Sequence, residues 1–238
     1  MSKTTYKSNH VRTTVAVGVF CALAYVCCIL FHFNAAFLTF DLKDAVMTVG
    51  AMIFGPLYGL AMAVIVAGIE ALTVSSTGWY GFIMNVISSG TFVFVGSLIY
   101  TRMRTLKGAV ISEIIAAVSM VAMMMGANIL ITPYYMGATA KDVIALIPTL
   151  LLPFNTVKAI FNASIVFIIY SPISMALKNA GFTSVTSSKG SNVSVSVISS
   201  AKKNKITAAI VMICAAAVAV CALVFFFVKL QGSFSFLK

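Results

Sequence analysis

The sequence predicts an all-α integral membrane protein: a bundle of six helices with one extra transmembrane helix near the C-terminus. Of the 238 residues, 61% are hydrophobic and only 9% are charged, and the mean hydropathy is +1.07. Several apolar stretches also reach about 20 residues, the length that crosses a bilayer. Because lipid offers no hydrogen bonds to an exposed backbone, stretches of this kind form helices.

Five apolar stretches each predict one helix, at roughly 13–33, 82–101, 109–132, 148–177 and 206–228. A sixth stretch, 45–74, is too long for one crossing, since its 30 residues would form a helix of about 45 Å. It also contains Gly55-Pro56, a pair that interrupts helices. We therefore predict a short helix over about 44–54, followed by a second helix.

The basic residues indicate how these helices are oriented. Lys3, Lys7 and Arg12 precede the first helix, which places the N-terminus in the cytoplasm by the positive-inside rule. Two helices over 45–74 bring the basic loop 102–107 to the same side. The net charge of +11 thus indicates membrane topology rather than a nucleic-acid partner. We expect a multi-pass plasma-membrane protein.

The chain divides into five parts by composition. A Ser-rich stretch near the C-terminus lacks the apolar density to pack and predicts a cytoplasmic linker. The predicted parts are a cytoplasmic N-terminus (1–11), a six-helix membrane domain (12–178), the linker (179–205), the additional transmembrane helix (206–230) and a C-terminal tail (231–238).

Lys158 is the most informative polar residue. It lies inside an apolar stretch, with Asn155 three residues before it and Asn162 four residues after it, so the three share one helix face. An ammonium group in hydrocarbon needs a partner, and an intramembrane lysine therefore indicates a functional site. Its long side chain could instead extend to the membrane surface.

The predicted topology brings Asn85, Asn128, Asn155 and Lys158 together near the outer surface of the membrane, beneath the loop between the first two helices. Amides, an ammonium group and nearby aromatic rings suit a polar, planar small molecule. For Asn85 and Asn162, a hydrogen bond to a neighbouring helix is an equally good interpretation.

Other functional classes find no support in the sequence. It contains no G-x-x-x-x-G-K-[ST] loop for nucleotide phosphates and no Ser-His-Asp or Cys-His pattern. No set of carboxylates and histidines is predicted inside the membrane. Glu70 and Glu113 fall near helix ends, where solvent exposure is as good an interpretation as a functional role. The five cysteines fit as small packing residues. We therefore predict no catalytic residues, no metal site and no enzyme activity.

Several short motifs, in this order and spacing, resemble one known family. They are FLTFD at 37–41, IFGPL at 53–57, GFIMN at 81–85, TPYY at 132–135 and PFNTVK at 153–158. Across most of residues 12–178 the chain resembles the S components, the substrate-binding membrane subunits of energy-coupling factor (ECF) vitamin transporters. PFNTVK looks like the PFN-x-x-K element of the riboflavin-specific branch.

The resemblance implies a six-helix fold that captures riboflavin from outside the cell, with no cofactor besides this transported ligand. It implies that Asn128, Asn155 and Lys158 hold the flavin and that the loop around Thr39 closes over it. Phe40 and Asn85, which the predicted topology brings to the same end, complete the expected ligand contacts.

S components carry no ATPase, so the resemblance also implies partners: a transmembrane coupling subunit and two ATP-binding-cassette ATPases. In the family this module docks on small residues of the first helix. Thr14, Gly18 and Ala22 recur here every four residues, although packing within the bundle would also explain them. The seventh helix has no counterpart in the usual six.

Two alternatives stay open at this point. One is an S component for another vitamin or a queuosine-like precursor. The other is a self-contained secondary transporter, whose uptake would respond to ion gradients without any ATPase.

Overall fold

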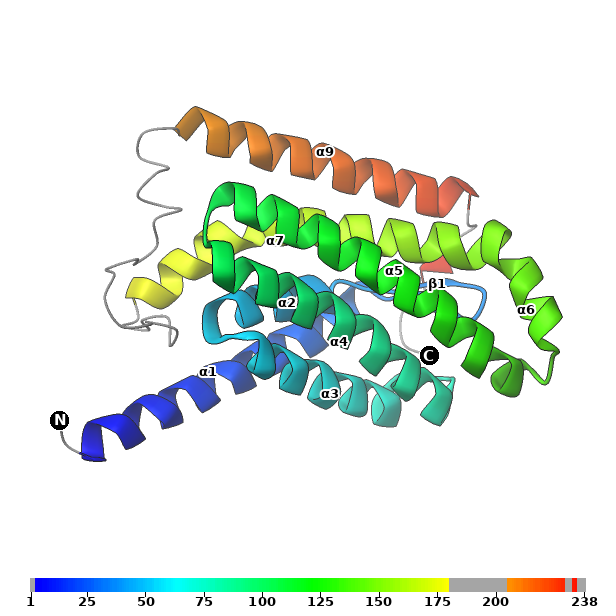
Figure 1. Ribbon diagram of the computed structural model, residues 1–238, viewed down its shortest axis with the longest axis horizontal. Helices are drawn as coiled ribbons and strands as arrows, with labels where there is room; N and C mark the ends of the chain where they lie inside the picture. Colours follow the sequence, from blue (N-terminus) through cyan, green and yellow to red (C-terminus); the bar gives the residue numbers. More distant parts are fainter. Residues whose placement is uncertain (1–2, 180–204, 230–232, 235–238) are drawn as a thin grey trace.

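The protein is a bundle of long helices with a small β-sheet at one end (Figure 1). The computed structural model describes residues 3–179, 205–229 and 233–234. The helices are α1 (Lys3–Leu30), α2 (Lys43–Phe54), α3 (Pro56–Thr73), α4 (Gly78–Met103), α5 (Leu106–Met136), α6 (Ala140–Leu146), α7 (Leu152–Asn179) and α9 (Lys205–Lys229). A π-helical turn, η1 (Ile147–Leu151), joins α6 to α7. The predicted all-α membrane class is confirmed.

Five of the described segments are long and apolar enough to cross a membrane: Val11–Leu30, Pro56–Thr73, Gly78–Met103, Lys107–Met136 and Ala140–Tyr170. Helix α2 has only 12 residues, and the described apolar part of α9 is also shorter than a full span. The predicted count of six bundle helices and one additional transmembrane helix therefore stays a prediction.

The predicted break in the stretch 45–74 is present. Gly55 separates α2 from α3 with a φ of 115°, a conformation that favours glycine, and Pro56 begins α3, where its missing N–H costs nothing. The two helices pack against each other, and α2 is buried along almost its whole length.

Other boundaries differ from the predicted ones. Helix α1 begins at Lys3, so residues 3–11 continue the first helix instead of preceding it. The last long segment, Ala140–Tyr170, begins with the short helix α6, which a Thr139–Asp142 capping box starts. Most of the predicted linker and tail lies outside the described residues.

A hairpin that the sequence did not predict connects α1 to α2. Strands β1 (Phe33–Ala35) and β2 (Leu38–Phe40) are antiparallel, and β3 (Ser233–Phe234) adds to the other edge of β1. Strands of two or three residues are too short to show an alternating pattern, so periodicity could not reveal them.

Helices α2, α3 and α4 approach closely at Gly59. A Cβ atom at this position would lie 2.5 Å from Ala51 Cβ and 2.7 Å from Val93 Cγ1. We expect Gly59→Ala to lower the free energy of unfolding by about 1–3 kcal/mol, because the packed core must shift. Gly18→Ala is the control, since a Cβ atom at Gly18 meets nothing within 4 Å. Equal thermal midpoints for the two variants in detergent would contradict this packing.

Candidate ligand-binding site

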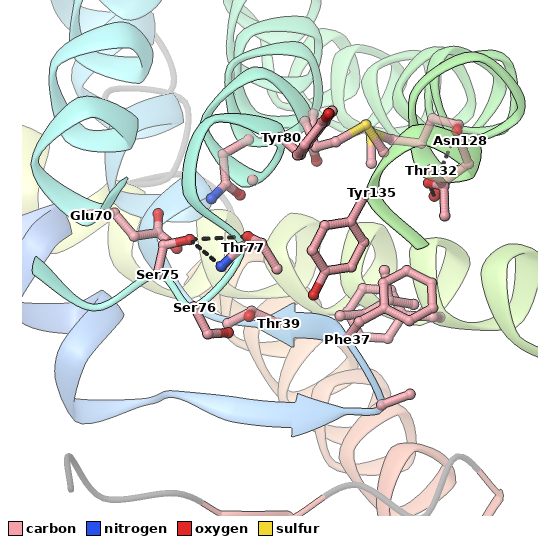
Figure 2. Close-up of a pocket in the computed structure, with 18 of the residues that line it drawn as sticks. Phe37, Thr39, Glu70, Ser75, Ser76, Thr77, Tyr80, Asn128, Thr132 and Tyr135 are labelled. Carbon is pink, nitrogen blue, oxygen red and sulfur yellow. Dashed lines mark hydrogen bonds between the residues drawn. The ribbon is translucent and has the colours of Figure 1, made fainter. Parts of the chain in front are cut away.

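A cavity of about 650 Å³ lies between the hairpin and the adjacent ends of α3, α4, α5 and α7. Figure 2 shows that the segment around Ser75–Thr77, the hairpin residues Phe37 and Thr39, and Asn128 and Tyr135 of α5 surround one space. The volume falls within the range of about 300–1,000 Å³ that is usual for small-molecule sites.

The cavity wall combines neutral polar groups with aromatic rings. The lining amides are Asn85, Asn128 and Asn155; the aliphatic hydroxyls are Thr39, Thr73, Ser75, Ser76, Thr77, Ser88 and Thr132; and the aromatic rings are Phe37, Tyr80, Tyr135 and Phe154. Such a wall can pair carbonyl, imide and hydroxyl groups of a ligand and contact a planar ring.

Five of the six predicted ligand residues line this cavity: Thr39, Asn85, Asn128, Asn155 and Lys158. Their contact with a ligand stays a prediction. Phe40 is not among the lining residues.

Phe40 is instead fully buried in an aromatic cluster. Its ring centroid lies 4.9 Å from that of Phe161 and 4.8 Å from that of Phe226. Because β2 alternates its faces, Thr39 and Phe40 point to opposite sides of the strand. We therefore assign Phe40 a packing role in place of the predicted ligand contact.

Helix backbone orients two of the lining amides. Asn128 Nδ2 donates to the Met124 carbonyl oxygen at 2.7 Å, and Asn128 Oδ1 accepts from Thr132 Oγ1 at 2.9 Å. Asn155 Nδ2 donates to the Leu151 carbonyl oxygen at 2.8 Å. These bonds hold each amide in one rotamer, which reduces the entropy that ligand binding must overcome.

Lys158 has partners within the protein. It is only 3% exposed, and its Nζ lies 3.1 Å from Asp41 Oδ2 and donates to the Thr39 carbonyl oxygen at 3.3 Å. The alternative that the side chain extends to the membrane surface is therefore wrong. The lysine holds the end of the hairpin against α7.

The same carboxylate also binds a second lysine. Lys43 Nζ lies 2.9 Å from Asp41 Oδ2 and 2.7 Å from Glu70 Oε2, and it donates to Asn85 Oδ1 at 3.4 Å. Nearby, Asp44 Oδ1 accepts from Ser89 Oγ at 2.5 Å. We call the five buried charged residues Asp41, Lys43, Asp44, Glu70 and Lys158 the charged cluster.

Sequence reasoning missed this cluster. It predicted no set of carboxylates and histidines inside the membrane and gave the loop between the first two helices no charged site. Helix α2, however, begins within the bundle, so charges at its first turn are buried. Glu70 and Glu113, for which solvent exposure and a functional role were equally good interpretations, are only 2% and 1% exposed. The available signal was the close succession of acid, lysine and acid immediately before an apolar helix.

The two lysines keep Asp41 ionised. Burial alone would raise the pKa of the Asp41 carboxyl, but the ammonium groups of Lys158 and Lys43 hold it well below its usual range. Asp41 therefore carries a negative charge at neutral pH.

Lys43 also bears on whether this cluster could bind a metal ion. The Cys28 thiol and the carboxylates of Asp41 and Glu70 offer atoms within 4.8 Å of one another. Lys43 Nζ contacts both of these carboxylates, so an ammonium group already supplies the balancing positive charge. The donor set is better explained as ion pairs than as a metal site.

Asn162 connects α7 to the chain after the hairpin. Its Oδ1 accepts from the Ala45 backbone N–H at 3.0 Å, and its Nδ2 donates to the Asp41 carbonyl oxygen at 3.1 Å. It does not line the cavity, which favours the structural interpretation.

Replacing Asn162 with alanine is expected to lower stability by about 1–3 kcal/mol, because two buried backbone groups lose a partner. The thermal midpoint in detergent measures this effect. Asn162→Asp is the matched comparison, since it keeps an acceptor for Ala45 while losing the donor. Equal thermal midpoints for the Asn162→Ala variant and the wild-type protein would contradict this structural role of Asn162.

The predicted partner residues lie on the outside of the bundle. Thr14, Gly18 and Ala22 are all exposed on α1. They form a face of small residues to which another helix could pack closely. Docking of a partner there stays a prediction.

The family described as "ECF transporter, substrate-specific component" matches residues 12–170, which is more than half of the chain. The chain belongs to the ECF S-component family. A search of curated proteins finds no match.

One solved structure supports the fold of this S component. It is described as "Structure and mechanism of the S component of a bacterial ECF transporter", with a TM-score of 0.62 and 21% sequence identity. The match covers 71% of this chain and 99% of that chain. At this identity the likeness shows the fold alone.

Family membership defines the general role. This S component is a multi-pass membrane protein and the substrate-specific subunit of an ECF transporter. It acts together with the other subunits of an ECF module.

Proposed function

We propose that this S component captures riboflavin at the outer surface of the membrane and releases it inside when an ATP-driven coupling module acts on it. One observation carries the proposal: three amides and a row of hydroxyls line a single cavity beneath the hairpin. The PFNTVK element, which resembles the riboflavin branch, supplies Phe154, Asn155 and Lys158 to that cavity.

The chemistry of riboflavin matches this wall group by group. The isoalloxazine imide and carbonyls pair with side-chain amides such as Asn128 and Asn155, each of which offers a donor and an acceptor. The ribityl hydroxyls suit the Ser75–Thr77 segment. The ring face suits Tyr80 and Tyr135, whose centroids lie 6.0 Å apart at the cavity wall.

The proposed organisation follows the sequence analysis. The binding domain comprises 12–178 and the N-terminus is cytoplasmic, so the hairpin and the cavity face outside. The partners are a transmembrane coupling subunit and two ATP-binding-cassette ATPases. Riboflavin is the transported ligand, and no cofactor is proposed.

Mass spectrometry of small molecules that copurify with the protein tests the substrate. Riboflavin is the expected ligand, and another vitamin or a queuosine-like precursor would overturn the riboflavin assignment while leaving the S-component role intact. Uptake that persists without any ATPase and follows an ion gradient would favour a self-contained secondary transporter.

Coupling to the ATPase module can be separated from binding. We expect Gly18→Leu to abolish ATP-dependent uptake while leaving ligand affinity unchanged, because a large side chain blocks close helix approach on α1. Gly126→Leu on α5 is the matched control, since a Cβ atom there also meets nothing within 4 Å. Normal uptake by the Gly18 variant in cells that contain the module would show that α1 is not the docking face.

A further inference from the structure

Few charged groups face the cavity. Among the described residues that line it, Glu70 and Lys158 carry charged side chains, and His32 carries an imidazole. Asp41, Lys43 and Asp44 lie directly behind the wall. The charged cluster thus places three carboxylates against two ammonium groups in one buried region.

The positive charge of Lys158 is already engaged. Asp41 binds its Nζ at 3.1 Å, the Thr39 carbonyl accepts from it at 3.3 Å, and Asp44 Oδ2 lies 4.0 Å away. An anionic ligand that approached Lys158 would have to compete with Asp41 and come close to the carboxylate of Asp44. Like charges that are brought together away from water repel strongly.

The other charged lining residue has the wrong sign for an anion. Glu70 is 2% exposed and lies on α3 at the cavity wall, beside the Ser75–Thr77 segment (Figure 2). Lys43 at 2.7 Å compensates its charge, so Glu70 does not require a cation from the ligand. Apart from the His32 imidazole, the remaining polar side chains of the wall are neutral amides and hydroxyls.

We propose that the Asp41–Lys158 ion pair and Glu70 restrict this site to ligands without net negative charge, so that it binds an uncharged vitamin and rejects the phosphate ester of the same molecule. In its choice of ligand, this inference rests on the proposed function. Asp41 and Glu70 are then specificity-determining residues, although Asp41 does not itself line the cavity.

Riboflavin and riboflavin 5′-phosphate are a matched pair of probes, since they differ only in the phosphate. With the purified full-length protein, we expect the phosphate ester to bind at least about thirtyfold more weakly, because it brings a dianion next to the carboxylates. Equal affinities, or tighter binding of the ester, would overturn the proposal.

The variant Asp41→Asn tests which group sets the preference. Removing this carboxylate leaves two carboxylates with two ammonium groups, so the cluster loses its excess negative charge and the affinity ratio should narrow by about tenfold or more. Asp142→Asn is the matched control, because Asp142 is exposed and bonds to Thr139 at the start of α6. A ratio that stays unchanged in a folded Asp41→Asn protein would contradict the assignment.

Two further measurements decide the proposal if Asp41→Asn does not fold or if flavins do not bind. If Asp41→Asn does not fold, Glu70→Gln replaces it and should narrow the same ratio. If neither flavin binds, the proposed function fails, and the charge of the copurifying ligand then decides the inference separately: an uncharged molecule supports it and an anion overturns it.

A second inference comes from the C-terminal helix, which lies beyond the family match at 12–170. Helix α9 runs along α7 (Figure 1). Its Phe226 is fully buried, with its ring centroid 4.8 Å from that of Phe40 and 6.2 Å from that of Phe154. Phe40 belongs to β2, and Phe154 lines the cavity.

The chain beyond α9 reaches the same hairpin. Strand β3 pairs with β1, with Ser233 opposite Asn34 and Phe234 opposite Phe33. The hairpin turn contributes Ala36 and Phe37 to the cavity wall. We infer that α9 and β3 form a strap that holds the hairpin over the cavity and slows its opening.

Hydrogen exchange of the purified protein without ligand tests this strap independently of the substrate. In Phe226→Ala, amides of residues 33–40 should exchange at least about tenfold faster, because the hairpin loses its aromatic contact and opens more often. Phe225→Ala is the control, since Phe225 is 42% exposed.

Exchange within 212–228 in the same experiment reports whether α9 itself stays folded. Unchanged exchange of the hairpin in Phe226→Ala would overturn the inference, whether α9 stays folded or not. Equal acceleration by Phe225→Ala with α9 still folded would overturn it as well.

Discussion

Replacing Lys158 with methionine is expected to destabilise the protein by about 3 kcal/mol or more, because a buried carboxylate loses one of its two cations. Asp41 would keep Lys43 at 2.9 Å but lose Lys158 at 3.1 Å, and the hairpin would lose the hydrogen bond at Thr39. The free energy of unfolding, or the thermal midpoint in detergent, measures the effect.

A double-mutant cycle separates the ion pair from simple loss of packing. Asp41→Asn alone leaves two ammonium groups with Glu70 and Asp44, whereas the combination with Lys158→Met removes one charge of each sign. We expect the double variant to recover much of the stability that either single variant loses. Losses that simply add would contradict direct coupling between Asp41 and Lys158.

The second large effect concerns affinity. We expect Asn155→Ala and Asn128→Ala each to weaken riboflavin binding by about tenfold to a hundredfold, because a polar group of the ligand is left without a partner, at a cost of about 1–3 kcal/mol. Equilibrium titration of the purified variants measures this change.

Thr156→Ala is the matched control for Asn155, since it is the next residue of α7 and does not line the cavity. It should bind as the wild type does. Wild-type affinity in both asparagine variants would place the ligand elsewhere.

Two features of the structure could be predicted from local sequence signals. Gly55-Pro56 is a strong backbone signal, and the break between α2 and α3 lies there. The spacing of Asn155, Lys158 and Asn162 predicts one helix face, and all three side chains do turn toward the hairpin end of the bundle. Both signals depend only on residues close together in the chain.

The charged cluster could not be predicted in the same way. Asp41 and Lys158 are 117 residues apart, and their contact depends on how α2 enters the bundle between α4 and α7. A charged residue in a loop before a helix is typically exposed to solvent. In this protein, tertiary packing buries such residues instead. Phe40 was misassigned for a related reason, because the aromatic partner that buries it, Phe226, lies in the additional helix.

The most direct test of the account is a fluorescence titration of riboflavin with the purified full-length protein, with Asn155→Ala in parallel. We predict quenching of flavin fluorescence with a dissociation constant below about 1 µM, equivalent to more than about 8 kcal/mol of binding free energy, and clearly weaker binding in the variant. Absence of binding by wild-type protein that is folded and free of prebound ligand would contradict the central claim.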